Sequence, residues 1–161
     1  MAVGGGGKIM SSNKSTERQL TGMAGEFLVA GKLFKLGYQV SITLGNAKSI
    51  DLYVSFGDSD SRPLCVQVKT LRKPNCFLIR QEDIKEDHIY VFVMLWDISK
   101  QEDYYIITGK EIMQNRDHFF GGSYWHEKPS NMPAINLGPL KDGGYKDRWD
   151  IFEEMLKSSG A

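Results

Sequence analysis

The first clear pattern of hydrophobic and polar positions lies in residues 20–36. Apolar residues recur there at the spacing of one helix face, and Gly37 follows as a natural stop. Cap-type residues at 15–17 precede the run. Three glycines interrupt it: Gly22, Gly25 and Gly31. Because glycine lowers helix propensity, these positions indicate a helix that packs closely against a sheet.

The chain after this helix is predicted to form mostly strands. Strand-like segments are 38–42, 50–56, 64–70, 77–79, 88–96 and 103–107. The second and third are joined by residues 57–63, which are all turn formers or polar. The segment 88–96 is almost continuously apolar, which is typical of a buried central strand. The segment 77–79 is expected to be a short edge strand.

The remaining segments predict two further helices and one irregular region. A short helix is expected at 109–114 and a closing helix at 146–157, whereas 121–144 is rich in Gly and Pro and is expected to be irregular. The chain contains no internal repeat and no linker. We therefore expect residues 15–161 to form a single α/β domain with a mixed central β-sheet flanked by helices. Residues 1–14 are expected to be a disordered leader.

Composition narrows the class of protein. The 161 residues include 41% hydrophobic residues, enough for a substantial core. No apolar run approaches the roughly 20 residues that a membrane span needs, and residues 1–15 do not form a signal peptide. The two cysteines, Cys65 and Cys76, lie in apolar surroundings without the spacing of metal ligands. A reducing, cytoplasmic location is the simplest interpretation.

The charge of the chain is balanced, with 20 basic and 20 acidic residues. This balance argues against a strong non-specific nucleic-acid binder, which is usually basic. A local basic patch is still present at Lys69, Arg72 and Lys73. It predicts contact with nucleic acid, and an ordinary solvated surface is the alternative interpretation.

Polar residues interrupt two of the predicted strands in a regular way. Side chains alternate along a strand, so Asp51 and Tyr53 share one face, and Gln67 and Lys69 share one face. If the connecting loop turns near Asp60, Asp51 lies opposite Lys69 and Tyr53 lies opposite Gln67. The polar groups would then converge on one side of the hairpin. The alternative is a half-exposed strand whose polar residues face water.

These residue types suit a metal-dependent phosphodiesterase. Asp51 and Gln67 can supply oxygen ligands to Mg²⁺ or Mn²⁺, and the carbonyl of Val68 can complete the protein ligands. Lys69 can orient or deprotonate an attacking water, or offset the phosphate charge. Glu26, on the helix that faces the site, can bind the metal directly or through water. An exposed or capping helix glutamate is the alternative for Glu26.

The order of these motifs resembles the PD-(D/E)XK nuclease superfamily. The similar segments are Gly-Glu-Phe-Leu-Val around Glu26, Ile50-Asp51, and Val-Gln-Val-Lys-Thr around Gln67 and Lys69, within about residues 15–108. The order is similar to the Holliday-junction-resolvase-like and homing-endonuclease-like branches. The resemblance implies a restriction-endonuclease-like fold and hydrolysis of DNA phosphodiester bonds by in-line attack of water. A homodimer is one possible arrangement, and RNA is not excluded as substrate.

Two positions depart from the pattern of this superfamily. Gln67 stands where the second acid is usual, and Ile50 stands where proline is common. Glutamine is neutral and ligates a metal more weakly than a carboxylate does. The alternative function is therefore a catalytically inactive module of the same fold that binds nucleic acid or another protein.

Overall fold

The computed structural model describes residues 13–44, 50–57, 61–121 and 132–159. Its first element is the long helix α1, Lys14–Lys35. Its N-cap is Asn13, whose side chain accepts a hydrogen bond from the N–H of Ser15 (3.3 Å). The expected cap at 15–17 is therefore wrong, because those residues already lie inside the first turn. Lys14 was expected to belong to a leader of residues 1–14, but it lies in the helix. Residues 1–12 of that leader lie outside the described ranges. The helix stops as expected, since Gly37 has a φ of 92°.

Five strands form the central sheet in the order β1-β2-β3-β5-β6. Their bounds are Gln39–Ile42 (β1), Leu52–Ser55 (β2), Leu64–Leu71 (β3), His88–Met94 (β5) and Asp103–Thr108 (β6). Strands β3 and β5 pair in parallel, and the other neighbours pair antiparallel. All seven residues of β5 are buried, which confirms the predicted central strand. The sheet is therefore mixed, as expected.

A second, two-stranded sheet covers one side of the first. It pairs β4, Cys76–Leu78, with β7, Ala134–Asn136. The other elements on this side are the 3-10 helix η1, Gln81–Asp83, and the helices α2, Gly109–Gln114, α3, Arg116–Phe120, and α5, Leu137–Asp142. The chain closes with α6, Ile151–Ser159.

Two predictions about the C-terminal third are wrong. Residues 134–142, expected to be irregular, form β7 and α5, because Ile135 is buried opposite Phe77 and Pro139 lies in the first helical turn, where proline is tolerated. The closing helix begins at Ile151 rather than at 146. The preceding residues run beside β6 instead, where the N–H of Asp147 donates to the carbonyl of Tyr104 (2.8 Å).

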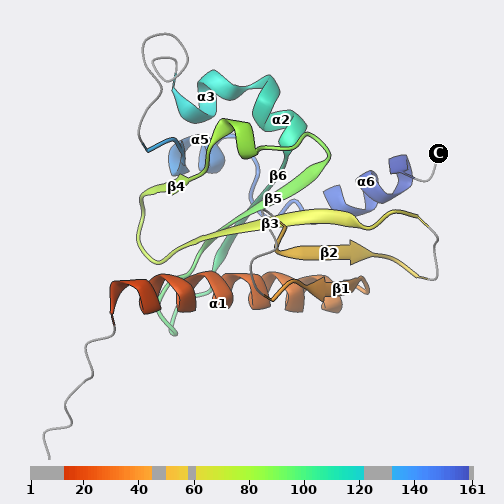
Figure 1. Cartoon of the computed structure of the whole chain (residues 1–161), viewed down its shortest axis with the longest axis horizontal. Helices are drawn as coiled ribbons and strands as arrows, with labels where there is room; N and C mark the ends of the chain where they lie inside the picture. Colours follow the sequence, from red (N-terminus) through yellow and green to blue (C-terminus); the bar gives the residue numbers. More distant parts are fainter. Residues whose placement is uncertain (1–12, 45–49, 58–60, 122–131, 160–161) are drawn as a thin grey trace, which may run out of the picture.

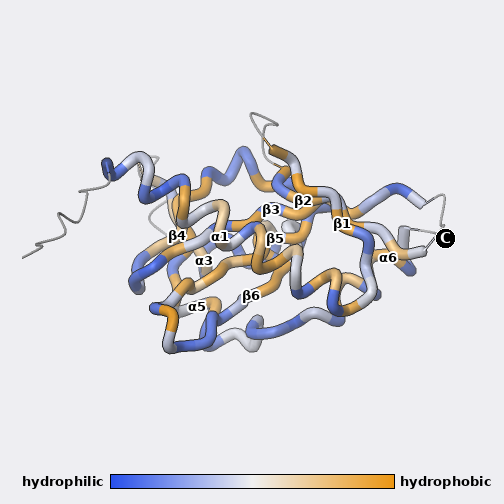
Figure 2. Tube along the Cα trace, turned by 90° about the horizontal axis from the view of Figure 1, so that it is seen from below, coloured by the Kyte–Doolittle hydropathy of each residue, from blue (hydrophilic) through white to orange (hydrophobic). Residues whose placement is uncertain are grey.

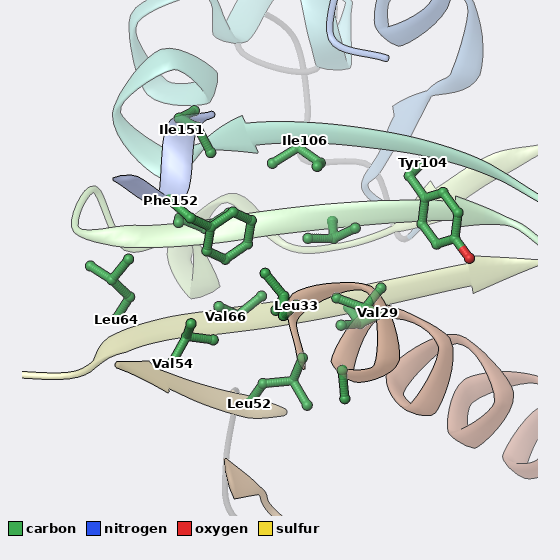
Figure 3. Close-up of a cluster of buried hydrophobic side chains, with 14 of the residues drawn as sticks. Val29, Leu33, Leu52, Val54, Leu64, Val66, Tyr104, Ile106, Ile151 and Phe152 are labelled. Carbon is green, nitrogen blue, oxygen red and sulfur yellow. The ribbon is translucent and has the colours of Figure 1, made fainter. Parts of the chain in front are cut away.

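The sheet separates two hydrophobic cores. Helices α1 and α6 contribute to one core, and α2, α3, α5 and the small sheet contribute to the other. Figure 1 shows α1 on one side of the strands and α2, α3 and α5 on the other. The first core joins Val29 and Leu33 of α1 to Val66 of β3 and Phe152 of α6 (Figure 3). Figure 2 shows the apolar stretches of chain gathered in the central strands. Both cysteines are free, and none of the described helices combines the length and apolar character that crossing a membrane requires.

Candidate metal and nucleic-acid site

Strand β2 is shorter than β3, and this difference leaves part of β3 without a neighbour on one side. The ladder between them pairs Leu52 with Val66 and Tyr53 with Cys65. The predicted register, with Tyr53 opposite Gln67, is therefore wrong by two residues. A shift of two residues preserves the alternation of side chains, so the predicted faces are correct although the predicted partners are not.

Asp51 sits at the end of this ladder and contacts both neighbours of Gln67. Its backbone N–H donates to the carbonyl of Val66 (2.9 Å), and its Oδ2 accepts from the N–H of Val68 (2.7 Å). On the other side, the N–H of Thr43 donates to the Asp51 carbonyl (2.9 Å). Asp51 is thus held beside Gln67 by hydrogen bonds from two directions, with its carboxylate at the unpaired edge of β3.

Gln67 is the most unusual member of the site. It is only 6% exposed, and its Oε1 atom has no hydrogen-bond partner among the described residues. Parallel pairing places it beside Tyr90 of β5, in the apolar surroundings of the second core. Buried polar atoms are almost always paired, because leaving one unpaired costs about 1–3 kcal/mol. A bound cation or hydrogen-bond donor would therefore stabilise this amide oxygen.

Glu26 reaches the site from the opposite layer. Its helix packs on the face that carries Val66 and Val68, whereas Gln67 and Lys69 belong to the other face. The approach is close because Gly25 has no side chain. A Cβ atom there would lie 1.8 Å from the Oγ1 of Thr70. Glu26 therefore approaches from the face of β3 that is opposite to the side chains of Gln67 and Lys69.

The carboxylates of Glu26 and Asp51 share an electrostatic environment with Lys69. Burial raises the pKa of Glu26, the negative charge of Asp51 raises it further, and Lys69 opposes the rise. Burial likewise raises the pKa of Asp51, against the opposing effects of the Val68 hydrogen bond and of Lys69. Lys69 therefore does not fully offset the two acids, and a further cation would favour their ionised forms.

The donor set that results is made of oxygens of three kinds. The N–H and C=O groups of one residue point to the same side of a strand, so the Val68 carbonyl points to the side that Asp51 occupies. Among the described residues, no three His, Cys, Asp or Glu side chains gather in a way that could hold a metal ion. A metal ion at this edge would therefore need the amide and carbonyl oxygens as well as the two carboxylates.

A basic groove of about 770 Å³ lies beside this edge, between the first half of α1 and the end of β3. Its charged residues are Lys14, Glu17, Arg18, Arg72 and Lys73. The Nε of Arg72 donates to the Oγ1 of Thr21 (2.8 Å), which ties the two sides together. Sequence reasoning found Arg72 and Lys73 but missed Lys14 and Arg18. The signal for the missed pair was their spacing of four residues, which places both on one side of a helix.

This chain is similar to solved structures of nucleases, two of which are described here. A bacterial homing endonuclease, I-Ssp6803I, matches with a TM-score of 0.57 and 18% identity over 88% of this chain and 95% of that one. The Holliday junction resolvase Hjc of Archaeoglobus fulgidus matches with a TM-score of 0.44 and 12% identity over 74% of this chain and 87% of that one. The sequence matches no protein-family profile and no curated protein. The first likeness confirms the restriction-endonuclease-like fold.

Proposed function

We propose that this protein is a metal-dependent DNA endonuclease that hydrolyses phosphodiester bonds by in-line attack of water. The observation that carries the proposal is the buried Oε1 of Gln67, which has no hydrogen-bond partner among the described residues, on the residue whose two neighbours contact Asp51. An acceptor that lacks a donor within the described part of the chain, near acids with raised pKa values, would be stabilised by a bound cation. The similarity in fold to a homing endonuclease supports the same proposal.

The residues present fit a hard divalent cation such as Mg²⁺ or Mn²⁺. Such ions take oxygen ligands and keep several waters, so a protein share of few ligands is sufficient. Asp51, Gln67 and the Val68 carbonyl would hold the ion, with Glu26 binding directly or through water. When bound, the ion acidifies a water molecule and stabilises charge on the phosphate.

The chain's own groups have separate tasks in this proposal. The N–H of Val68 fixes the orientation of the Asp51 carboxylate through the 2.7 Å hydrogen bond. Lys69, whose positive charge acts on both acids, would orient the attacking water or offset charge on the phosphate. Only its uncharged form would deprotonate the water. Glu26 brings a second negative charge to the site from α1.

The basic groove supplies a path for the nucleic-acid backbone. Four of its charged residues are cations and one is an acid, although the whole chain has no net charge. Because phosphate contacts release counterions, binding through Arg72 and Lys73 should weaken steeply as salt increases. The groove reaches Thr70, the residue that follows Lys69, so a backbone lying in it would pass beside the proposed site.

A second candidate is a nucleic-acid-binding module of the same fold without turnover. The neutral side chain of Gln67 favours it, together with the finding that no metal-binding group of three His, Cys, Asp or Glu occurs in the described part of the chain. The two candidates differ in metal binding and in cleavage, and both predict binding to DNA.

The deciding experiment is cleavage of single-stranded, duplex and branched DNA, with RNA in parallel, in Mg²⁺ or Mn²⁺. Asp51→Ala and Lys69→Ala are expected to lose activity by about 100-fold or more while remaining folded. Asp142→Ala and Lys141→Ala on α5 are matched controls, because both side chains are exposed and neither residue lines the basic groove.

Calorimetry with Mn²⁺ separates the remaining outcomes. Metal binding that Asp51→Ala abolishes, together with cleavage, supports the nuclease. If DNA binds with a steep salt dependence but the wild-type protein neither binds metal nor cuts, the second candidate is correct. If DNA does not bind either, both proposals are wrong.

A further inference from the structure

The solvent-facing side of α1 carries large apolar side chains. Leu20 is 55% exposed, Met23 39%, Phe27 52% and Phe34 54%. A helix on the surface of a protein usually presents polar residues on this side. From this stripe (Leu20, Met23, Phe27, Gly31 and Phe34) we infer that two copies of the chain associate, with their α1 helices packed antiparallel. The inference is independent of the proposed catalytic function.

The stripe lies directly opposite the face that α1 packs on the sheet. Leu20, Phe27 and Phe34 recur every seven residues, so they drift only about 20° per step around the helix. The fully buried Val29 is about half a turn away from Leu20. Because α1 forms the outer layer on its side of the sheet (Figure 1), the stripe is available to a second molecule.

The spacing of the stripe is the same in both directions from its centre. Met23 and Gly31 lie four residues from Phe27, and Leu20 and Phe34 lie seven residues from it. A two-fold interface requires such self-complementarity, because each residue meets its counterpart in reverse order. In an antiparallel pair centred on Phe27, Leu20 of one copy would meet Phe34 of the other.

The same arrangement matches a large residue with a small one. Met23 of one copy would meet Gly31 of the other, where a Cβ atom would find nothing within 4 Å. The glycine therefore leaves a notch into which the methionine fits, and methionine adapts readily to irregular gaps. Neither a parallel pair nor a shifted register makes this match.

Charge at the two ends of α1 also favours the antiparallel orientation. Glu17 lies in the first turn and Lys35 in the last, about one quarter turn or less from the stripe and on the same flank. In a pair centred on Phe27, Glu17 of one copy and Lys35 of the other would differ in height by only about 3 Å. The two opposite charges would therefore be neighbours across the interface.

The size of the stripe sets the expected strength. Large apolar side chains bury about 150–250 Å² each when fully covered, so four that are about half exposed contribute about 400 Å² per copy. Specific interfaces bury about 800 Å² per partner. A dimer held by α1 alone is therefore expected to dissociate on dilution rather than to be permanent.

Sedimentation equilibrium over a concentration series tests this inference with the full chain. The wild-type protein should show a monomer–dimer equilibrium, and Phe27→Lys should raise its dissociation constant by about tenfold or more, since two like charges would meet at the centre. Ile98→Lys, at a fully exposed position on the β5–β6 connection, should leave it unchanged. Circular dichroism shows whether each variant is folded.

Charge reversal distinguishes this dimer from other arrangements. Glu17→Lys and Lys35→Glu should each weaken association, and the double variant should restore it. If the wild-type protein is a monomer at every concentration, the inference is wrong. This holds whatever else covers the stripe. A dimer that Phe27→Lys does not weaken, or a double variant that does not recover, overturns the inference as well.

Discussion

Gly25 controls how closely α1 approaches β3, and its replacement by alanine is the sharpest test of the packing around the site. The added Cβ would lie 1.8 Å from the Oγ1 of Thr70, 3.0 Å from its Cβ and 3.1 Å from its Cγ2. Rotation of Thr70 can move the hydroxyl but not its own Cβ. The helix must therefore move away from the strand in Gly25→Ala.

The size of the effect follows from comparison with Gly22→Ala. Alanine is favoured over glycine in a helix by about 1 kcal/mol at either position. At Gly22 nothing lies within 4 Å of the added Cβ, so that gain should be realised in full. At Gly25 the overlap should cost about 1–3 kcal/mol, the usual range for overpacking. Because the helix preference cancels, Gly25→Ala should be about 1–3 kcal/mol less stable than Gly22→Ala.

Urea unfolding of the two variants measures this difference directly. Adding Thr70→Ser to Gly25→Ala should recover part of the loss, since serine has one heavy atom fewer on its Cβ and can turn the hydroxyl away. Equal stability of the two alanine variants would refute the close approach of α1 to β3. A loss that Thr70→Ser does not change at all would place the strain elsewhere.

The same substitution also tests whether helix position matters to the proposed chemistry. Glu26 follows Gly25 directly, so a helix that moves outward carries its carboxylate away from Asp51. A displacement of about 1 Å can cost about 100-fold in rate. Gly25→Ala should therefore lose metal affinity or cleavage at temperatures where it is fully folded, whereas Gly22→Ala should retain both.

Two further predictions concern titrating groups. In EDTA, the free energy of unfolding should fall as pH rises from the ordinary pKa of Asp51 through its raised value, because the folded state holds the proton more tightly. The Asp51→Asn variant should show a smaller fall and should melt at a higher temperature than the wild-type protein near pH 7. It should also lose the stabilisation by Mg²⁺. Burial alone would raise the pKa of Glu111, but hydrogen bonds from Thr108 and Arg148 lower it, so its contribution is present above the ordinary pKa and lost in acid. Glu111→Ala should cost about 1 kcal/mol in urea unfolding at pH 7, and the cost should shrink toward pH 3.

The alternation of side chains along β3 could be predicted from the sequence, but the register could not. The faces of Gln67 and Lys69 follow from the two-residue period alone. The partners of Asp51 depend on how residues 57–63 divide between turn and strand, and the assumption of a turn centred on Asp60 displaced the ladder by two residues. The error was harmless to the site because an even shift keeps each side chain on its face.

The contribution of α1 shows a different limit. The periodicity of residues 20–36 predicts a helix, which the structure confirms. The face that the apolar residues predict is mostly wrong, because Leu20, Met23, Phe27 and Phe34 are exposed. The helix instead buries Gly25, Val29, Ala30 and Leu33.

The periodicity also does not reveal that Glu26 lies near enough to Asp51 for the charge of Asp51 to raise its pKa, because this depends on how closely α1 packs on β3. The sequence also does not show that Lys14 and Arg18 share a groove with Arg72. The hydrogen bond that joins the two segments, from Arg72 to Thr21, spans about fifty residues.

The role of Gln67 is where burial changes the interpretation most. In the sequence, a glutamine in a Val-rich strand fits a solvated edge as well as a ligand. The structure removes the first interpretation, because the side chain is buried and its Oε1 is unpaired among the described residues. The pKa values of Glu26 and Asp51 are both raised, and the charge of Lys69 only partly opposes the rise. A divalent cation would pair the amide oxygen and stabilise both carboxylates at once, which a single added hydrogen-bond donor would not do.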